Sequence, residues 1–203
     1  MNKDDRDIEL VRKKYNTFSR YYDLLVKFIE GKSFDKIREH LLKNLKGNIL
    51  EVGVGTGKNL EYYNKEPRVI GVDISKKMLD NAIKKSKLLK KDFTLFNMDI
   101  RHLKFKNESF DYVICTLVLC SVPDPIKAIK EMRRVCKKNG KILMIEHMLS
   151  ENKIIAFFEN ILTPFTRKFF GCNLNRKTTE NIIKCGLKIN KEINFKLFDV
   201  FKI

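Results

Sequence analysis

A short apolar run in the first half of the chain ends in three glycines at alternate positions. The run covers residues 48–52, the glycines are Gly53, Gly55 and Gly57, and residues 58–63 predict the first turns of a helix. A buried strand that passes through glycines into a helix presents backbone N–H groups, with no side chains in the way, at its carboxyl end. Open α/β sheets bind ligands at this edge, so the loop predicts a ligand site.

The spacing of the glycines separates three kinds of ligand loop. A phosphate-binding loop of the G-x-x-x-x-G-K-[ST] type around Gly57 would need a glycine at Val52 and a hydroxyl at Asn59, so it departs from the pattern twice. A dinucleotide-binding G-x-G-x-x-G loop starting at Gly53 would need a glycine at Lys58, so it departs once. The spacing excludes a phosphate-binding loop and weakens the interpretation as a dinucleotide-binding loop.

Acidic residues stand at or near the ends of successive apolar runs. Glu51 lies two residues before the first glycine, Asp73 ends the run 68–73, and Asp99 ends the run 93–99. Asp73 lies about where nucleotide-binding folds carry an acid that binds a ribose. For each acid taken alone, the alternative is a strand-end carboxylate that caps a helix.

Strand and helix patterns alternate five times through the middle of the chain. This alternation requires a parallel sheet with right-handed crossovers, and two adjacent extended runs after it predict an antiparallel C-terminal hairpin that closes the sheet. The predicted fold is α/β, with a doubly wound, mostly parallel, seven-stranded sheet. The predicted strands cover residues 48–52, 68–73, 93–99, 112–116, 141–147, 187–193 and 194–203.

Helical periodicity predicts further elements on either side of this core. Residues 8–31 and 34–45 predict two amphipathic N-terminal helices with a break near Gly31. Residues 154–170 predict an apolar helical segment that breaks near Pro164.

The whole chain is predicted to form a single domain with three parts. Residues 1–46 form a helical lid, residues 47–147 the cofactor-binding core, and residues 148–203 a roof over the acceptor with the closing hairpin. Within the core, a helix that starts at Pro125 is expected to end at Asn139-Gly140 as a left-handed cap.

Length and composition limit the classes of protein. The chain has 203 residues, of which 43% are hydrophobic, and this suits one compact domain. We expect no membrane-spanning segment and no signal peptide, because no apolar run is long enough and the first residues are charged. The five cysteines form no C-x-x-C pair, so we expect no metal site, reduced thiols and a cytoplasmic location.

The net charge of +17 allows several interpretations. It could attract an anionic membrane surface or a nucleic acid, or it could reflect lysines spread over solvated faces. The lysines recur along the whole chain, and aromatic residues are not interleaved with basic ones as in RNA-binding motifs. We therefore favour spread lysines, then peripheral contact with an anionic membrane, and we place nucleic acid last.

A family resemblance accounts for all of these motifs in order. The glycine loop, the second and third strand ends, the approach to the fourth strand and the turn before the fifth strand resemble those of class I S-adenosylmethionine-dependent methyltransferases. The segments that carry the resemblance are Ile49–Gly57, Gly71–Ser75 with Met78-Leu79, Asp99, Ser109–Val113 and Val135–Leu143.

The resemblance implies S-adenosyl-L-methionine as the cofactor, a cation without phosphates that favours carboxylates and carbonyls over an anion cradle. It implies that Glu51 holds the loop or approaches the methionyl ammonium, and that Asp73 accepts both ribose hydroxyls. Ile74 and Met78 are implied to enclose the adenine, with Asp99 and the Ile100 backbone at its amino edge. The other implied cofactor contacts are Glu51, Gly53, Gly55, Gly57 and Asp73, with Cys115, Thr116 and Leu117 on the methionyl side.

Finer similarities point to the methyl acceptor. Residues 15–23 are similar to the lid of ubiquinone/menaquinone-biosynthesis methyltransferases, whereas 115–122, 146–147 and 171–174 look closer to thiol S-methyltransferases. Bacterial phospholipid N-methyltransferases are related to both. The resemblance implies a small-molecule or lipid-type acceptor: a thiol, a quinol precursor or an aminophospholipid.

Methyl transfer is an in-line displacement that depends mainly on holding donor and acceptor together, and a base is needed only if the acceptor must lose a proton. His147 is the candidate base, with a structural histidine as the alternative, and Tyr22 is a candidate acceptor contact. The phenylalanines of 154–170 favour either an apolar acceptor or ordinary core packing. An RNA methyltransferase and a non-catalytic cofactor-binding protein are the alternative functions, and we expect a monomer or homodimer.

Overall fold

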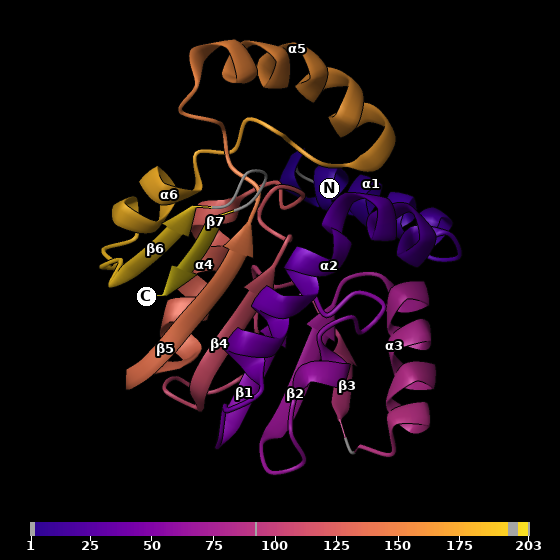
Figure 1. Cartoon of the computed structure of the whole chain (residues 1–203), viewed down its shortest axis with the longest axis vertical. Coiled ribbons are helices and arrows are strands. Elements are labelled where there is room, and N and C mark those ends of the chain that lie inside the picture. The colour runs from indigo at the N-terminus through magenta and orange to yellow at the C-terminus, as the bar shows by residue number, and fades with distance from the viewer. Residues whose placement is uncertain (1–2, 92, 195–198, 203) are drawn as a thin grey trace.

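The computed structural model describes residues 3–91, 93–194 and 199–202, and it contains a twisted sheet at its centre (Figure 1). Its strand order is β3-β2-β1-β4-β5-β7-β6. The α/β class and the parallel core of β1 to β5 are confirmed. The strands are β1 (Asn48–Val52), β2 (Arg68–Asp73), β3 (Thr94–Asn97), β4 (Phe110–Thr116), β5 (Cys136–Glu146), β6 (Lys191–Asn194) and β7 (Asp199–Lys202).

The last two strands pair antiparallel with each other, and β7 also pairs antiparallel with β5. Both strands are shorter than the predicted runs 187–193 and 194–203. The segment 195–198 that joins them, and Ile203, lie outside the described residues.

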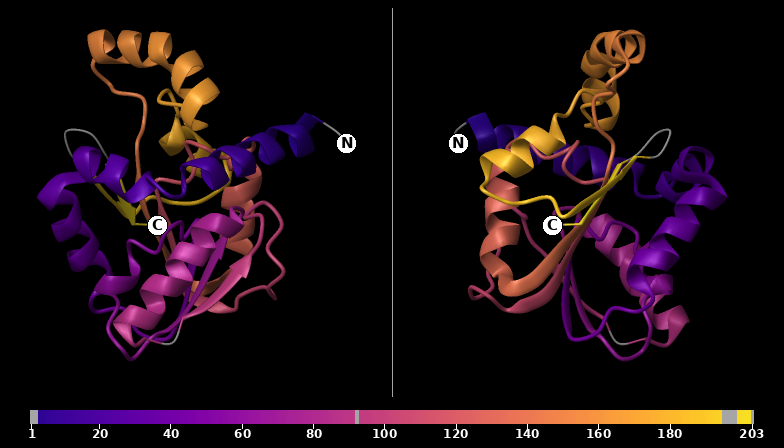
Figure 2. Two further views of the ribbon diagram at one scale, coloured as in Figure 1. Left: turned by 90° about the vertical axis from the view of Figure 1, so that its right-hand side faces the viewer. Right: turned by 60° about the vertical axis from the view of Figure 1, so that its left-hand side comes forward.

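Helices cover both faces of the sheet, as the doubly wound prediction requires. In Figure 2, α2 and α3 lie on one side of the sheet and α4 lies on the other. Two buried clusters fill these layers, one around Ile129 and Met132 of α4 and one around Leu42 and Leu79. The helices are α1 (Lys3–Phe18), α2 (Tyr22–Leu42), α3 (Lys76–Leu89), α4 (Pro125–Val135), α5 (Lys153–Phe170) and α6 (Thr178–Lys184). None of the helices in the described part of the chain is long and apolar enough to cross a membrane.

The predicted break between the N-terminal helices was wrong in its position. The chain turns after Phe18, where the Tyr21 N–H donates to the Phe18 carbonyl oxygen at 2.9 Å, and α2 then continues through Gly31. A glycine inside a helix costs only about 1 kcal/mol relative to alanine, so packing can override it. The early turn leaves α1 above the carboxyl ends of the strands (Figure 1).

Three further helix boundaries differ from the prediction. Residues 58–63 form only a short 3₁₀ turn, Leu60–Tyr62, and α5 runs through Pro164 without ending. The helix before β5 ends at Val135, and Gly140 lies within the strand. A Cβ at Gly140 would lie 2.7 Å from Cys136 Sγ and 2.9 Å from the Asp111 carbonyl oxygen, so this glycine serves close packing and not a left-handed cap.

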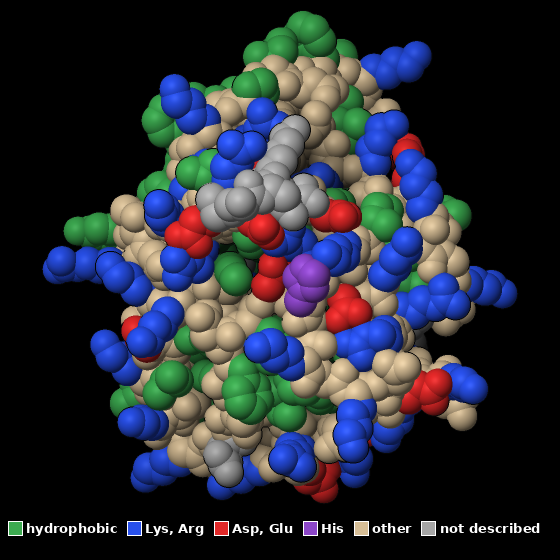
Figure 3. Space-filling model, turned by 180° about the vertical axis from the view of Figure 1, so that it is seen from behind, with side chains coloured by type: hydrophobic (Ala, Val, Ile, Leu, Met, Phe, Trp, Pro, Cys, Tyr) green, Lys and Arg blue, Asp and Glu red, His purple; other side chains and the backbone are tan. Residues whose placement is uncertain are grey.

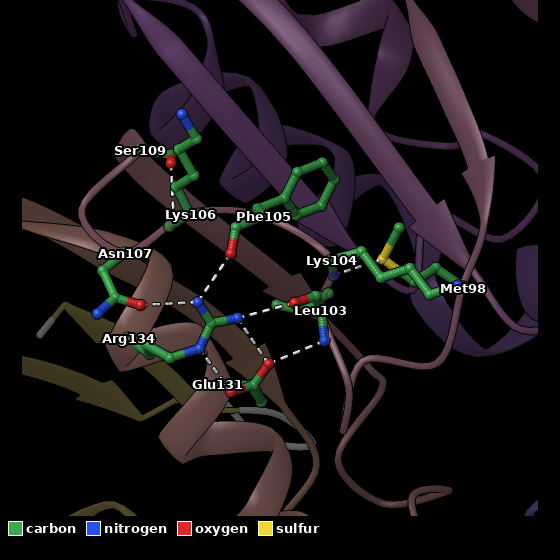
Figure 4. A network of polar contacts seen from close by, with 9 residues as sticks. All are labelled: Met98, Leu103, Lys104, Phe105, Lys106, Asn107, Ser109, Glu131 and Arg134. Atoms are coloured by element: carbon green, nitrogen blue, oxygen red, sulfur yellow. Dashed lines mark hydrogen bonds and ion pairs between the residues drawn. The ribbon is translucent and has the colours of Figure 1, made fainter.

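A polar network fixes the loop between β3 and β4 (Figure 4). The guanidinium of Arg134 donates to the carbonyl oxygens of Leu103 and Phe105, both at 2.8 Å, and it pairs with Glu131. Glu131 in turn accepts from the Leu103 N–H at 2.8 Å. The network therefore fixes the segment that follows Ile100 against α4.

A buried carboxylate fixes the chain after β4. Glu146, the last residue of β5, is fully buried and accepts hydrogen bonds from the Val118 N–H at 3.0 Å, the Leu119 N–H at 3.2 Å and the Cys115 thiol at 3.2 Å. Burial raises the pKa of Glu146 to about 7, against the lowering effect of these donors. The Glu146 side chain therefore organises the loop from Leu117 onward.

Replacing Glu146 with glutamine should change how stability depends on pH. A carboxyl whose pKa is raised on folding stabilises the protein fully below its unfolded pKa, about 4.5, and this contribution is lost as the pH rises through about 7. Relative to Glu146→Gln, the wild type should lose up to about 3 kcal/mol of unfolding free energy between about pH 4.5 and 8. Urea denaturation of both proteins measures the difference, and parallel pH profiles would contradict it.

Candidate active site

Two adjoining cavities open at the carboxyl ends of β1, β2 and β4, under α1. The larger spans about 610 Å³, part of which is open to solvent, and it continues into the smaller through shared lining residues. The shared residues are Tyr22, Gly53, Gly55, Thr116 and Leu117. Together the cavities form one cleft with an apolar end and a polar end.

The glycine loop gives this cleft its floor. Gly53, Gly55 and Gly57 have φ values of +67°, +57° and +80°, a region that other residues rarely adopt. A Cβ on Gly53 would lie 2.3 Å from Val118 Cγ2, and one on Gly57 would lie 2.7 Å from Leu60 Cδ1. A Cβ on Gly55 would meet nothing closer than 3.9 Å. Of these three glycines, only Gly55 therefore leaves open space in the cleft where a side chain would otherwise stand.

Asp73 links the end of β2 to this loop. Its Oδ2 accepts from the Gly55 N–H at 2.9 Å and its Oδ1 accepts from the Ser75 N–H at 2.8 Å. The side chain lines the larger cavity, and burial raises the pKa of Asp73 to about 6 in spite of these two donors. The carboxylate therefore holds the loop while it faces the cleft.

The apolar end of the cleft lies beyond Asp73. Ile74, Met78 and Ile100 line it, together with Asp99. The Asp99 carboxylate also accepts from Arg101, through the backbone N–H at 2.9 Å and the guanidinium at 2.8 Å. Part of the acceptor capacity of Asp99 is thus used within the protein.

The polar end of the cleft contains buried groups of opposite charge. Glu51 accepts from Tyr63 Oη at 2.9 Å and from Asn59 Nδ2 at 3.1 Å, and burial raises its pKa to about 7. The guanidinium of Arg38, whose residue is 3% exposed, donates to Asn59 Oδ1 at 2.9 Å and lines the same cavity. Asn59 also donates to Thr116 Oγ1 at 3.1 Å, so one amide connects both charges to the end of β4.

The N-terminal helices close the cleft from above. Ile8, Val11, Tyr15 and Tyr22 line the larger cavity. Tyr15 Oη lies 2.6 Å from Ser121 Oγ, and this is one of several polar contacts that tie the lid to the site. Two others are Ser75 Oγ to Asn16 Oδ1 at 2.7 Å and Thr56 Oγ1 to Asp23 Oδ1 at 2.5 Å.

Three predicted site residues do not line either cavity. Gly57 shapes the loop, and Cys115 is fully buried with its thiol directed at Glu146. His147 Nε2 lies 3.4 Å from Glu159 Oε1, so this histidine pairs with α5. Within the described residues, no group of His, Cys, Asp and Glu could hold a metal ion.

Residues that pattern reasoning missed also line the cleft. Arg38 lies on the second helix of the predicted lid, but it was not among the predicted site residues, because no spacing rule connects it to the glycine loop. Val118 and Ser121 follow β4 on the loop that Glu146 organises. The one available signal was the position of this loop at the carboxyl end of a central strand.

Comparisons with known proteins agree with this arrangement. Residues 50–144 match a family model described as a methyltransferase domain. The chain is 37% identical over 121 residues to a phosphatidylethanolamine N-methyltransferase of Cereibacter sphaeroides, covering 59% of this chain and 60% of that relative. It is 32% identical to a demethylmenaquinone methyltransferase of Staphylococcus epidermidis, covering 80% of this chain and 70% of that protein.

A solved structure shares the fold. A SAM-dependent methyltransferase from Aquifex aeolicus superposes with a TM-score of 0.64 at 16% identity, covering 87% of this chain and 95% of that one. The glycine loop, the acids at the strand ends and the aligned relatives lead to one conclusion. The chain belongs to the class I S-adenosylmethionine-dependent methyltransferases.

Proposed function

We propose that this enzyme methylates an apolar or amphipathic small-molecule or lipid-type acceptor that binds under α1, next to S-adenosylmethionine. The observation that carries the proposal is the lining of the larger cavity, which includes Ile8 and Val11 of the lid together with Val118 and Val122. The paired hydroxyls of Tyr15 and Ser121 are the polar groups at that end. Such a wall favours an acceptor with a hydrocarbon part and one polar reacting end.

The residues of the cleft fit the cofactor. Gly55 leaves open space beside the Asp73 carboxylate, which suits the close approach of a ribose. Ile74, Met78 and Ile100 form an apolar slot suited to an adenine. We assign cofactor binding to Glu51, Gly53, Gly55, Asp73, Ile74, Met78, Asp99, Ile100, Thr116 and Leu117, and to Arg38 in addition.

The polar end suits the amino-acid part of the cofactor, which carries an ammonium and a carboxylate. Arg38 supplies a cation to the carboxylate, while Glu51 supplies the negative potential that attracts the ammonium. Asn59 bonds to both and fixes their separation. When bound, S-adenosylmethionine supplies a methyl carbon activated by its sulfonium, and the chain contributes mainly the alignment of the acceptor.

In this proposal residues 1–46 form a lid, 47–147 the cofactor core, and 148–203 an acceptor roof with a closing hairpin. The lid and the core line the two cavities, whereas no described residue of 148–203 lines either of them. Tyr22 lines both cavities and is placed to contact the acceptor as well as the cofactor. His147 lies beside Glu159 and outside both cavities, which favours a positioning role for His147 over that of a general base.

Replacing Asp73 with asparagine should weaken cofactor binding. The change removes the charge and one of the two oxygens that accept from Gly55 and Ser75, so affinity for S-adenosylmethionine should fall about 10- to 100-fold. Titration calorimetry measures the loss. Asp80→Asn, an exposed position on α3, is the matched control and should bind as wild type. Unchanged affinity of Asp73→Asn would contradict the assignment.

Replacing Arg38 with glutamine should affect only ligands that carry the amino-acid part. Affinity for S-adenosylmethionine should fall about tenfold or more, whereas affinity for 5′-methylthioadenosine, which lacks that part, should change less than about twofold. Arg68→Gln, an exposed position, is the control. Equal losses for both ligands would mean that Arg38 acts only by holding the fold.

A labelled-methyl assay tests the acceptor class. We expect transfer from S-adenosylmethionine to at least one amphipathic acceptor in a panel of aminophospholipids, quinol precursors and alkyl thiols. Substituting Val11→Gln should raise KM for that acceptor with little change in cofactor affinity, because Val11 lines only the larger cavity. Transfer confined to RNA or to hydrophilic acceptors would overturn the proposal.

A further inference from the structure

α5 turns its polar face toward the protein and its apolar face toward solvent, whereas a typical surface helix does the opposite. It lies at the end of the molecule above α1, away from the sheet (Figures 1 and 2). The residues that turn inward are Ala156, Glu159, Thr163 and Thr166, whereas large apolar side chains cover the exposed side. The exposed residues are Ile154, Ile155, Phe157, Phe158, Ile161, Leu162, Phe165, Phe169 and Phe170.

The exposed apolar residues form one continuous face. At about 100° per residue, all of them except Phe170 fall within about 160° of the helix circumference. Their exposed fractions run from 45% for Phe170 to 70% for Ile154. A surface helix normally buries such a face in the core, and exposed apolar patches of this kind mark sites of interaction.

Specific contacts hold the polar face of α5 toward the protein. Glu159 Oε2 accepts from the Ser150 N–H at 2.8 Å, and Glu159 Oε1 lies 3.4 Å from His147 Nε2. Thr166 Oγ1 donates to the Cys172 carbonyl oxygen at 2.8 Å, and Lys14 Nζ donates to the Arg167 carbonyl oxygen at 2.5 Å. Rolling the helix to bury its apolar face would break these contacts, so its orientation is built into the fold.

The charges around this face indicate what covers it. Lys153, Arg167 and Lys168 on α5 are exposed, and the chain carries a net charge of +17. Figure 3 shows hydrophobic side chains over the upper end of the molecule, where α5 lies, with Lys and Arg side chains beside them. An apolar face with cations at both ends of the helix complements an anionic lipid surface, whereas a second copy of this chain would bring like charges together.

We propose that the outer face of α5 docks onto an anionic lipid surface, with the helix lying in the plane of the interface. Docking brings α1 close to the lipid, because Phe18 of α1 stacks on Phe170 at 5.7 Å between ring centroids. The cavity under α1 then lies beside the surface from which an amphipathic acceptor would come. Docking itself requires neither cofactor nor acceptor, so it can be tested separately from catalysis.

Vesicle co-sedimentation of the full chain tests this docking. Wild type should bind vesicles of phosphatidylcholine with phosphatidylglycerol more tightly than vesicles of phosphatidylcholine alone. Ile154→Gln/Phe158→Gln should bind the anionic vesicles at least about tenfold more weakly. The control Leu88→Gln/Ile183→Gln removes two apolar residues that are 83% and 61% exposed on α3 and α6, and it should bind as wild type. Circular dichroism and S-adenosylmethionine affinity verify that each variant is folded.

A fluorescent probe locates the contact, because the chain contains no tryptophan. Emission of Phe158→Trp should shift to the blue on adding anionic vesicles, and emission of Ile183→Trp should not. Wild-type binding by Ile154→Gln/Phe158→Gln, or no binding by wild type, would overturn the proposal. So would a blue-shifted Phe158→Trp without vesicles in a protein that sediments as a dimer, because a second copy would then cover α5.

Discussion

The site depends on one carboxylate at the end of β2. Asp73 accepts the N–H of Gly55 with one oxygen and the N–H of Ser75 with the other. Ser75 caps α3 through its side chain and also donates to Asn16 of the lid. A single buried acid thus fixes the relative positions of the glycine loop and the start of α3, and through Ser75 also that of α1. Few other groups could do this, because the position requires two acceptors on a short side chain.

Buried acids lie along the carboxyl ends of the strands, although the molecule as a whole is strongly basic. Glu51, Asp73 and Glu146 lie at the carboxyl ends of β1, β2 and β5, and burial raises their pKa values to about 7, 6 and 7. The chain as a whole carries +17. A cationic ligand would relieve the cost of keeping Glu51 and Asp73, the two of these acids that line the cleft, ionised away from water. This electrostatic contrast suits a sulfonium cofactor and disfavours a nucleotide with several phosphates.

The core and the cofactor edge could be predicted because each depends on local rules. Alternate glycines imply positive φ values, and Gly53, Gly55 and Gly57 all have them. Asp73, Ile74, Met78 and Ile100 line the cleft because strand ends in a parallel sheet share one edge. Arg38 escaped prediction because its helix approaches the loop only in three dimensions. Cys115 lies on β4 and His147 directly follows β5, but their side chains face Glu146 and Glu159 rather than the cleft. The apolar segment 154–170 was correctly predicted to be helical, but its phenylalanines were expected to contact an acceptor or pack in the core, whereas they lie exposed on α5 and line neither cavity.

The acids and glycines of the cleft suit a cationic cofactor without phosphates. Calorimetric titration of the wild-type protein with S-adenosylmethionine, ATP and NAD under identical conditions tests this selectivity. We expect S-adenosylmethionine to bind with one equivalent per chain, and ATP and NAD to bind at least about 100-fold more weakly. Binding of ATP or NAD as tight as that of S-adenosylmethionine, or no binding of S-adenosylmethionine, would contradict it.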